Sequence, residues 1–159
     1  MKKIAICGSE DKYFTPAQRT DAVKKIRDIL NSHALRYGDG NAPEYDYNDL
    51  IMVSGGCPHS GIDIWAEIVA DILGVQKEIY LPEVNQWEDE IVHFGYQGLV
   101  HMGYESLNRK GYKSRNIQIA EACDVLYCID PKGRKWSGGR FTMEAARKLS
   151  KEVHLVEID

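Results

Sequence analysis

The sequence contains no hydrophobic run that approaches the roughly 18 residues a helix needs to span a membrane. Its beginning, Met1 to Glu10, is basic and then apolar, but the apolar run is too short for a signal peptide and is better interpreted as a first strand. Internal repeats, low-complexity tracts and linkers are also missing. The 159 residues therefore predict a single domain over residues 1–159, with no membrane partner.

Cysteine is scarce as well. The four cysteines are too few for a disulfide framework in a chain of this size, and none of them forms a C-x-x-C pair. This favours a reducing compartment, and hence a cytoplasmic protein. Cys57 and His59 are potential metal ligands, but no second close pair accompanies them, and ordinary turn residues are the alternative. The sequence predicts neither a metal site nor a cofactor.

The positive and negative charges of the sequence nearly balance, with 20 Lys and Arg against 24 Asp and Glu. The formal net charge of −4 at pH 7 argues against general nucleic-acid binding. The distribution is uneven, because eleven basic residues face four acidic ones between Arg109 and Lys151. This local excess of positive charge suits the binding of an anionic small ligand or a nucleic-acid strand. Alternatively, these side chains only cover solvent-exposed faces of helices. That alternative explains the basic residues after Arg140 better than those at positions 132–135.

What is present is an alternation of short apolar runs with segments of helical periodicity. With short connections, this alternation predicts an α/β fold with right-handed crossovers and a parallel sheet. The expected strands cover residues 3–8, 50–53, 77–82, 124–130 and 153–158. The expected helices cover residues 16–34, 60–73, 111–123 and about 140–149.

Two stretches fit this alternation less well. Residues 36–48 are polar and rich in Gly, Tyr, Asp and Asn, which indicates an insertion loop at the surface. Residues 85–110 carry apolar side chains interrupted by glycines, which is typical of either a lid or a broken covering helix. The apolar residues from Trp87 to Leu107 would also suit the contact of a homodimer.

Two glycine-rich turns join the expected strands to helices. Ser54-Gly55-Gly56 follows one strand, and Ser137-Gly138-Gly139 precedes the last helix. A strand, a glycine turn and a helix N-terminus place free backbone N–H groups around an anion. Neither turn matches G-x-x-x-x-G-K-[ST], and Gly8 lacks the partners of G-x-G-x-x-G, so no ATP or GTP phosphate loop and no standard dinucleotide site is expected. In an open parallel sheet, both turns would meet Gly8, Ser9 and Glu10 beyond the carboxyl ends of the strands.

Five motifs follow one another along the chain: Ser54-Gly55-Gly56, Gly61-Ile62-Asp63-x-x-Ala66, Trp87, Gly111-Tyr112 with Arg115-Asn116, and Gly138-Gly139-x-x-Thr142. In kind and order they resemble those of the SLOG superfamily, which includes DNA-processing protein A of natural transformation and the LONELY GUY phosphoribohydrolases. The resemblance extends from Lys3 to Ile158. It implies a single Rossmann-like three-layer domain with a mainly parallel sheet of five or slightly more strands, helices on both faces, and a nucleotide-type pocket.

The first wall of this pocket would come from Ser54, Gly55 and Gly56, whose N–H and hydroxyl groups would bind a phosphate. A tight strand–helix junction that needs glycine is the alternative. Asp63 would contact the ligand, or would instead complete an S-x-x-[DE] capping box with Ser60.

The opposite wall would come from the later motifs. Arg115 would clamp an anion with two hydrogen bonds, or would be an exposed arginine at a helix start. Asn116 would read a base or sugar edge, or would cap the helix. Gly138, Gly139 and Thr142 would close over the other end of the ligand.

A catalytic role rests on two glutamates. The phosphoribohydrolases carry a proline-glycine-glycine loop followed by G-T-x-x-E, whose glutamate works on the glycosidic bond. Here the proline is missing, and Thr142 and Glu144 are two residues apart rather than three. In an N-glycosidase, Glu144 or Glu10 would stabilise an oxocarbenium-like ribose.

These observations favour a protein that binds a nucleotide or nucleotide-derived small ligand, as a sensor or a processing protein. The enzymatic alternative is a hydrolase that cleaves the N-glycosidic bond of a nucleoside monophosphate. Binding of single-stranded DNA, as in the DNA-processing relatives, is the third hypothesis.

Overall fold

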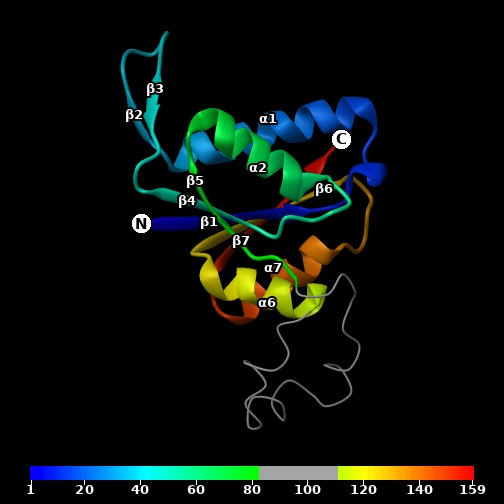
Figure 1. Ribbon diagram of the computed structural model, residues 1–159. Coiled ribbons are helices and arrows are strands. Elements are labelled where there is room, and N and C mark those ends of the chain that lie inside the picture. The colour runs from blue at the N-terminus through cyan, green and yellow to red at the C-terminus, as the bar shows by residue number, and fades with distance from the viewer. Residues whose placement is uncertain (83–110) are drawn as a thin grey trace.

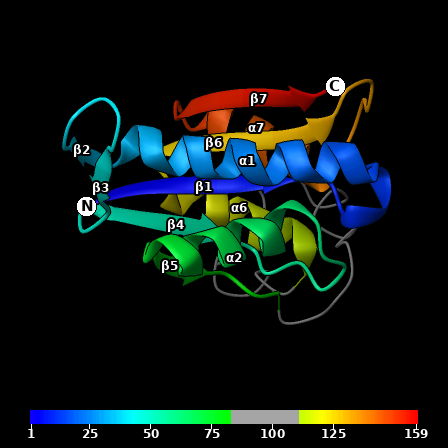
Figure 2. The ribbon, with the colours of Figure 1, turned by 90° about the horizontal axis from the view of Figure 1, so that it is seen from above.

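The chain forms a five-stranded parallel sheet in a computed structural model that describes residues 1–82 and 111–159. Its strands are β1 (Lys2–Gly8), β4 (Leu50–Ser54), β5 (Gln76–Ile79), β6 (Val125–Pro131) and β7 (Glu152–Ile158). They lie in the order β5-β4-β1-β6-β7, and the arrows of β1, β4, β6 and β7 point the same way in Figure 2. The chain builds one side of β1 first and the other side afterwards, so its winding reverses beside β1.

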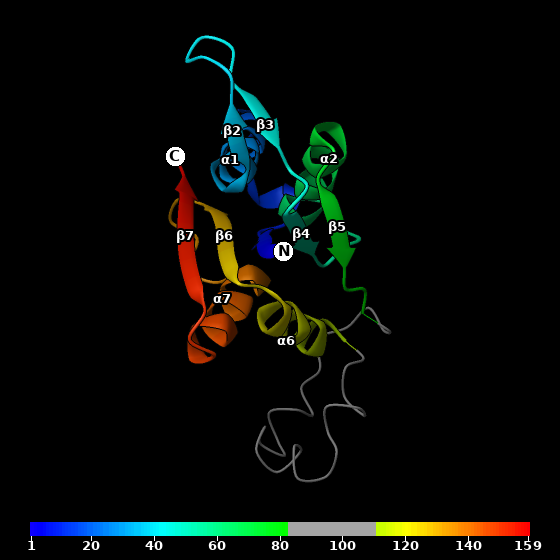
Figure 3. The ribbon, with the colours of Figure 1, turned by 90° about the vertical axis from the view of Figure 1, so that its left-hand side faces the viewer.

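Helices cover both faces of the sheet. Figures 1 and 3 show α1 (Pro16–His33) and α2 (Ile62–Leu73) on one face, and α6 (Tyr112–Ala122) and α7 (Gly138–Lys148) on the other. Alternate residues of β1 serve the two layers: Ile4 and Ile6 join the core under α1 and α2, whereas Ala5 and Cys7 join the core under α6 and α7. The predicted three-layer α/β fold with a five-stranded parallel sheet is confirmed.

The local signals behind this fold act as expected at the first helix. Thr15 caps α1: its hydroxyl accepts a hydrogen bond from the N–H of Gln18, whose side chain accepts one from the N–H of Thr15. Pro16 occupies the first turn, where its missing N–H costs nothing. Between β1 and α1 lies one short 3₁₀ turn, η1 (Asp11–Tyr13). None of the described helices is both long and apolar enough to cross a membrane.

The expectation of a plain loop over residues 36–48 is wrong. This stretch forms an antiparallel hairpin of β2 (Leu35–Tyr37) and β3 (Glu44–Asp46), which stands apart from the main sheet in Figure 1. The Asp39 carboxylate accepts hydrogen bonds from the N–H groups of two residues in the turn, and Gly38 has a φ of 84°. The polar and glycine-rich composition therefore encodes a turn between two short strands.

The expectations for residues 85–110, namely a lid or broken helix and a homodimer contact from Trp87 to Leu107, lie outside the described residues.

Glycines allow the end of β1 to lie against two other elements. A Cβ atom on Gly8 would overlap the carbonyl oxygen of Ile129 and lie 2.8 Å from the Ile62 side chain. A Cβ atom on Gly139, at the start of α7, would lie 2.7 Å from the Cα atom of Gly8. The missing side chain of Gly8 therefore lets β1 lie against β6 and α2, and that of Gly139 lets the N-terminus of α7 reach the carboxyl end of β1.

We therefore expect Gly8→Ala to lower the free energy of unfolding by about 2 kcal/mol or more, because a backbone oxygen cannot move aside as a side chain can. Urea denaturation followed by circular dichroism measures this change. The matched control is Gly40→Ala in the hairpin turn, where an added Cβ meets nothing within 4 Å. It should change stability by no more than about 1 kcal/mol. Equal stability of the two variants would contradict the close packing of β1 against β6 and α2.

Candidate functional site

A cavity of about 240 Å³ opens at the carboxyl ends of β1 and β6, where the winding of the sheet reverses. We call it the strand-end cavity. Its position is the one where open α/β sheets bind ligands, and its volume lies just below the roughly 300–1,000 Å³ of typical ligand pockets. The lining comes from the end of β1 with η1, the loop before α2, the first turns of α2, α6 and α7, and the loop after β6.

Most of the predicted site residues line this cavity, and some do not. Those in its lining are Gly8, Ser9, Glu10, Asp63, Arg115, Asn116, Gly138, Gly139 and Thr142. Outside the lining lie Ser54, Gly55, Gly56 and Glu144.

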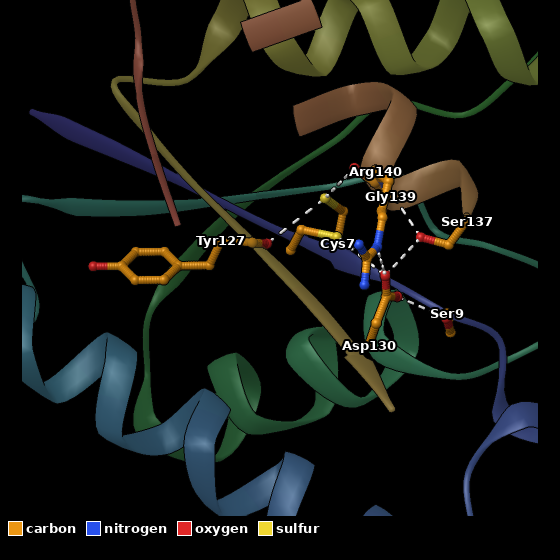
Figure 4. A network of polar contacts seen from close by, with 8 residues as sticks. Cys7, Ser9, Tyr127, Asp130, Ser137, Gly139 and Arg140 are labelled. Atoms are coloured by element: carbon orange, nitrogen blue, oxygen red, sulfur yellow. Dashed lines mark hydrogen bonds and ion pairs between the residues drawn. The ribbon is translucent and has the colours of Figure 1, made fainter. Parts of the chain in front are cut away.

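A buried carboxylate, Asp130, organises one side of the cavity (Figure 4). One of its oxygens accepts a hydrogen bond of 2.6 Å from the Ser9 hydroxyl, at the end of β1. The other accepts hydrogen bonds from the Ser137 hydroxyl at 3.0 Å and from Nε of Arg140 at 2.8 Å. The carboxylate also holds the pKa of Arg140 above its usual value, mainly through this hydrogen bond. Asp130 thus ties β1 and the start of α7 to β6.

The N-terminus of α7 opens into the cavity. Ser137 is its N-cap and accepts a hydrogen bond of 3.1 Å from the N–H of Arg140, while Gly138 and Gly139 begin the helix. The side chains of Thr142 and Asn116 both donate to the carbonyl oxygen of Gly138, at 3.0 and 3.4 Å. A Cβ atom on Gly138 would meet no atom closer than 3.7 Å, so there is space beside this residue. The first N–H groups of a helix carry its positive end, which makes this turn suitable for an anion.

Arg115 forms the opposite side, and it is buried rather than exposed. Its guanidinium donates to the carbonyl oxygens of Gly55 and Tyr80, and its Nε donates to the side chain of Asn116 at 2.9 Å. A Cβ atom on Gly55 would lie 2.5 Å from this guanidinium. Arg115 therefore uses much of its hydrogen-bonding capacity inside the protein and joins α6 to the end of β4.

The Ser54-Gly55-Gly56 turn contacts Arg115 through Gly55 and does not line the cavity. The Ser54 hydroxyl donates to Glu67 of α2 at 2.8 Å, and Gly56 has a φ of 60°, which favours glycine. These contacts support the interpretation of the turn as a strand–helix junction. Position 55 needs a glycine because the guanidinium of Arg115, 60 residues further along the chain, fills the space of a side chain.

The predicted capping box of Ser60 and Asp63 is wrong. The N-cap of α2 is Gly61, with a φ of 93° and no hydrogen bond from a capping side chain. The N–H of Ile62 instead donates to the carbonyl oxygen of Ser9 at 3.2 Å, so the start of α2 is held by the end of β1. Asp63 is buried in the cavity wall. Burial raises its pKa to about 6, although the nearby charge of Arg115 lowers it.

The two predicted catalytic glutamates are separated. Glu10 lines the cavity, next to η1. Glu144 is exposed on α7, and its carboxylate forms an ion pair with Arg147 one turn further on. The shortened spacing between Thr142 and Glu144 turns the glutamate away from the buried face that Thr142 occupies. The position of Glu144 therefore does not support a role at the cavity.

Sequence reasoning missed several residues of this site. Asp130 and Arg140 were not singled out, although an acidic residue that ends an apolar strand was a usable signal. Three further residues at the mouth of the cavity, Tyr13, Arg134 and Trp136, were not predicted as ligand contacts. Within residues 1–82 and 111–159, no three His, Cys, Asp or Glu side chains lie close enough together to hold a metal ion.

Two cysteines lie beneath the cavity. Cys7 and Cys128 are partners in the register of β1 and β6, and both are buried and free. The hydrogen bond between their side chains, followed by burial, raises the pKa of the Cys7 thiol well above its usual range. A protonated thiol is a poor nucleophile, so Cys7 contributes packing to the cavity floor.

No protein-family model matches the chain, and no curated protein matches it either. Among solved structures, it is similar to the X-ray structure of DNA processing protein A from Streptococcus pneumoniae, with a TM-score of 0.55 and 16% sequence identity. The match covers 98% of this chain and 50% of that one, so the chain spans about half the length of that protein. The resemblance to the SLOG superfamily as a whole stays a prediction. What the comparison shows is the fold: a Rossmann-like α/β fold like that of DNA processing protein A.

Proposed function

We propose that the chain binds a nucleotide or nucleotide-derived small ligand in the strand-end cavity. The observation that carries this proposal is the opening of the α7 N-terminus into a cavity at the reversal point of a parallel sheet. Gly138 leaves space there for a phosphate, and the first N–H groups of α7 supply donors and the positive end of the helix dipole. The volume of about 240 Å³ suits one nucleotide better than a dinucleotide.

The backbone carries more of the anion binding in this proposal than the arginines do. Arg140 is already bound to Asp130, and Arg115 is bound to carbonyl oxygens with the carboxylate of Asp63 nearby. Each guanidinium charge is therefore largely balanced inside the protein. A bound phosphate would therefore not become the counter-ion of either arginine, because Asp130 and Asp63 already have that role.

Single-stranded DNA is a second candidate ligand. The solved structure of similar fold is that of a DNA processing protein, and Lys132, Arg134 and Lys135 lie on the loop beside the cavity. Binding to a DNA strand would weaken steeply with added salt, because each neutralised phosphate releases counterions. Titration of a labelled deoxythymidine oligomer at several salt concentrations separates this candidate from a free nucleotide.

A nucleoside monophosphate at about 100 times its Kd is expected to stabilise the folded protein by roughly 2.7 kcal/mol, measured as a rise in melting temperature. Gly138→Asp should abolish this rise, because a carboxylate at the first turn of α7 occupies the space and repels a phosphate. The variant itself should be as stable as the natural chain or slightly more stable, because an acidic side chain favours a helix N-terminus.

The matched control is Gly40→Asp, which adds the same charge in the distant hairpin turn, where a Cβ meets no atom within 4 Å. This variant should keep the full ligand-induced rise. A rise that persists in Gly138→Asp would contradict phosphate binding at α7. No rise with any nucleoside monophosphate would contradict the proposed function.

The affinity should also depend on the charge of Asp63. This carboxyl has a pKa of about 6, so it is neutral at pH 5 and ionised at pH 7.5. Ionisation adds a negative charge to the cavity wall and should weaken the binding of an anion as the pH rises. For a separation on the order of 10 Å at an effective dielectric constant near 20, the loss is about tenfold for each unit of negative charge on the ligand.

The reference variant for this measurement is Asp63→Asn, which keeps the size of the side chain and has no charge to gain. A phosphate monoester itself titrates at about pH 6, and this contribution cancels when the two proteins are compared. Calorimetric titrations between pH 5 and 7.5 should show similar affinities at the low end and weaker binding by the natural chain at the high end. A ratio of affinities that stays constant with pH would show that Asp63 does not titrate near the ligand.

A further inference from the structure

Three side chains gather at the mouth of the strand-end cavity: Tyr13 from η1, and Arg134 and Trp136 from the loop after β6. We call them the aromatic rim. The Cζ atom of Arg134 lies over the Tyr13 ring, 3.4 Å from its centre, so the two form a cation–π contact. Tyr13 and Trp136 nevertheless keep 40% and 59% of their surface exposed. A pair of exposed aromatic residues on one cavity differs from isolated apolar residues scattered over a surface.

The backbone holds the rim in place. The N–H of Tyr13 donates to the carbonyl oxygen of Glu10 at 3.2 Å, which closes η1. The N–H of Arg134 donates to the carbonyl oxygen of Pro131 at 3.2 Å, and Gly133 has a φ of 87°, which suits a tight turn. Tyr13 and Arg134 are therefore presented at the cavity by short hydrogen-bonded turns, and Trp136 follows the second turn by two residues.

The rim also contains a donor without a partner. Nε of Arg134 is buried and has no hydrogen-bond acceptor in the described part of the chain. A buried donor without an acceptor costs free energy, and a ligand that brings an acceptor removes this cost. The same guanidinium lies over the Tyr13 ring, and Trp136 is exposed on the same cavity. A ligand group that is flat and carries hydrogen-bond acceptors therefore suits the rim.

We propose that the aromatic rim is a nucleobase subsite, in which the base of a nucleoside monophosphate stacks on Trp136 beside the Tyr13–Arg134 pair. This inference rests on the proposed function and adds the part of the ligand that the α7 N-terminus does not explain. Aromatic rings and arginine planes are the surfaces on which proteins stack unpaired bases. Acceptors on the base edge satisfy Nε of Arg134.

The spacing along the chain fits one nucleotide. Trp136 is two residues before Gly138, so their Cα atoms are no more than about 7 Å apart. A base on the indole and a phosphate at the first turn of α7 are then separated by the sugar that joins them. The cavity of about 240 Å³ beside the rim receives one such unit, which favours a free mononucleotide over a strand.

Calorimetric titration with AMP, GMP, CMP and UMP tests the subsite, with ribose 5-phosphate as the ligand that lacks a base. Trp136→Ala should weaken nucleotide binding roughly tenfold, because the stack is lost, and should leave the binding of ribose 5-phosphate unchanged. Trp136→Phe should keep nucleotide affinity within about threefold of the natural chain, because a phenyl ring still stacks. Tyr13→Ala should weaken nucleotide binding in the same direction.

Two matched controls lie outside the rim. Tyr37→Ala removes a tyrosine of similar exposure, 44%, from the hairpin, and Lys135→Ala removes a cation that neighbours Arg134 in sequence but does not line the cavity. Both variants should bind nucleotides with the affinity of the natural chain, whereas Arg134→Ala should bind them more weakly. Bound base should also quench tryptophan fluorescence in the natural chain, and this quenching should disappear in Trp136→Phe while affinity is retained.

The outcomes separate this inference from the function on which it rests. If ribose 5-phosphate binds as tightly as the nucleotides and Trp136→Ala has no effect, the rim is not a base subsite, and the phosphate site at α7 stands. If neither the nucleotides nor ribose 5-phosphate bind, the proposed function fails together with the subsite. If a deoxythymidine oligomer binds at least 100-fold more tightly than the mononucleotide, with a steep salt dependence, the rim belongs to a strand-binding surface, and the proposal of a free mononucleotide is overturned.

Discussion

The cavity depends first on one buried charge, the carboxylate of Asp130. A buried carboxylate is costly unless donors surround it, and the donors here come from both elements that flank the cavity on this side. Ser9 fixes the end of β1, while Ser137 and Arg140 fix the first turn of α7. The geometry at the phosphate side of the proposed site is therefore set by the need to satisfy one carboxylate, and Gly8 and Gly139 allow the approach that this requires.

A second buried charge holds the other wall. Arg115 joins α6 to the end of β4 through backbone carbonyls, and Gly55 exists in this position because the guanidinium occupies the space of a side chain. Asp63 lies close enough for the arginine to lower its pKa, yet burial raises that pKa further than the arginine lowers it. In both walls of the cavity, one buried charged side chain, Asp130 or Arg115, joins elements that are distant in the sequence.

The sequence predicted the fold well because its signals are local. The apolar run Val125–Ile129 and the Thr15–Pro16 helix start need no knowledge of the rest of the chain. The site was predicted only in part. Gly138 and Gly139 followed from a turn pattern, but the reason for Gly55 lies in Arg115, and the capping pattern of Ser60 and Asp63 gave way to a contact between α2 and the end of β1. The position of Asp130 at the end of an apolar strand was visible, but its partners Ser9, Ser137 and Arg140 were not, because contacts between distant residues have no local pattern.

The balance of charge inside the walls bears directly on the proposed base subsite. Because both deep arginines already face carboxylates, a bare phosphate gains mainly from backbone N–H groups and the dipole of α7, and these contributions are modest. A ligand that also stacks on the aromatic rim gains an apolar and cation–π contribution that does not depend on its charge. In the proposed complex, Tyr13, Arg134 and Trp136 would give selectivity for nucleotides over other phosphates, and the glycine turn at α7 would set the position of the phosphate.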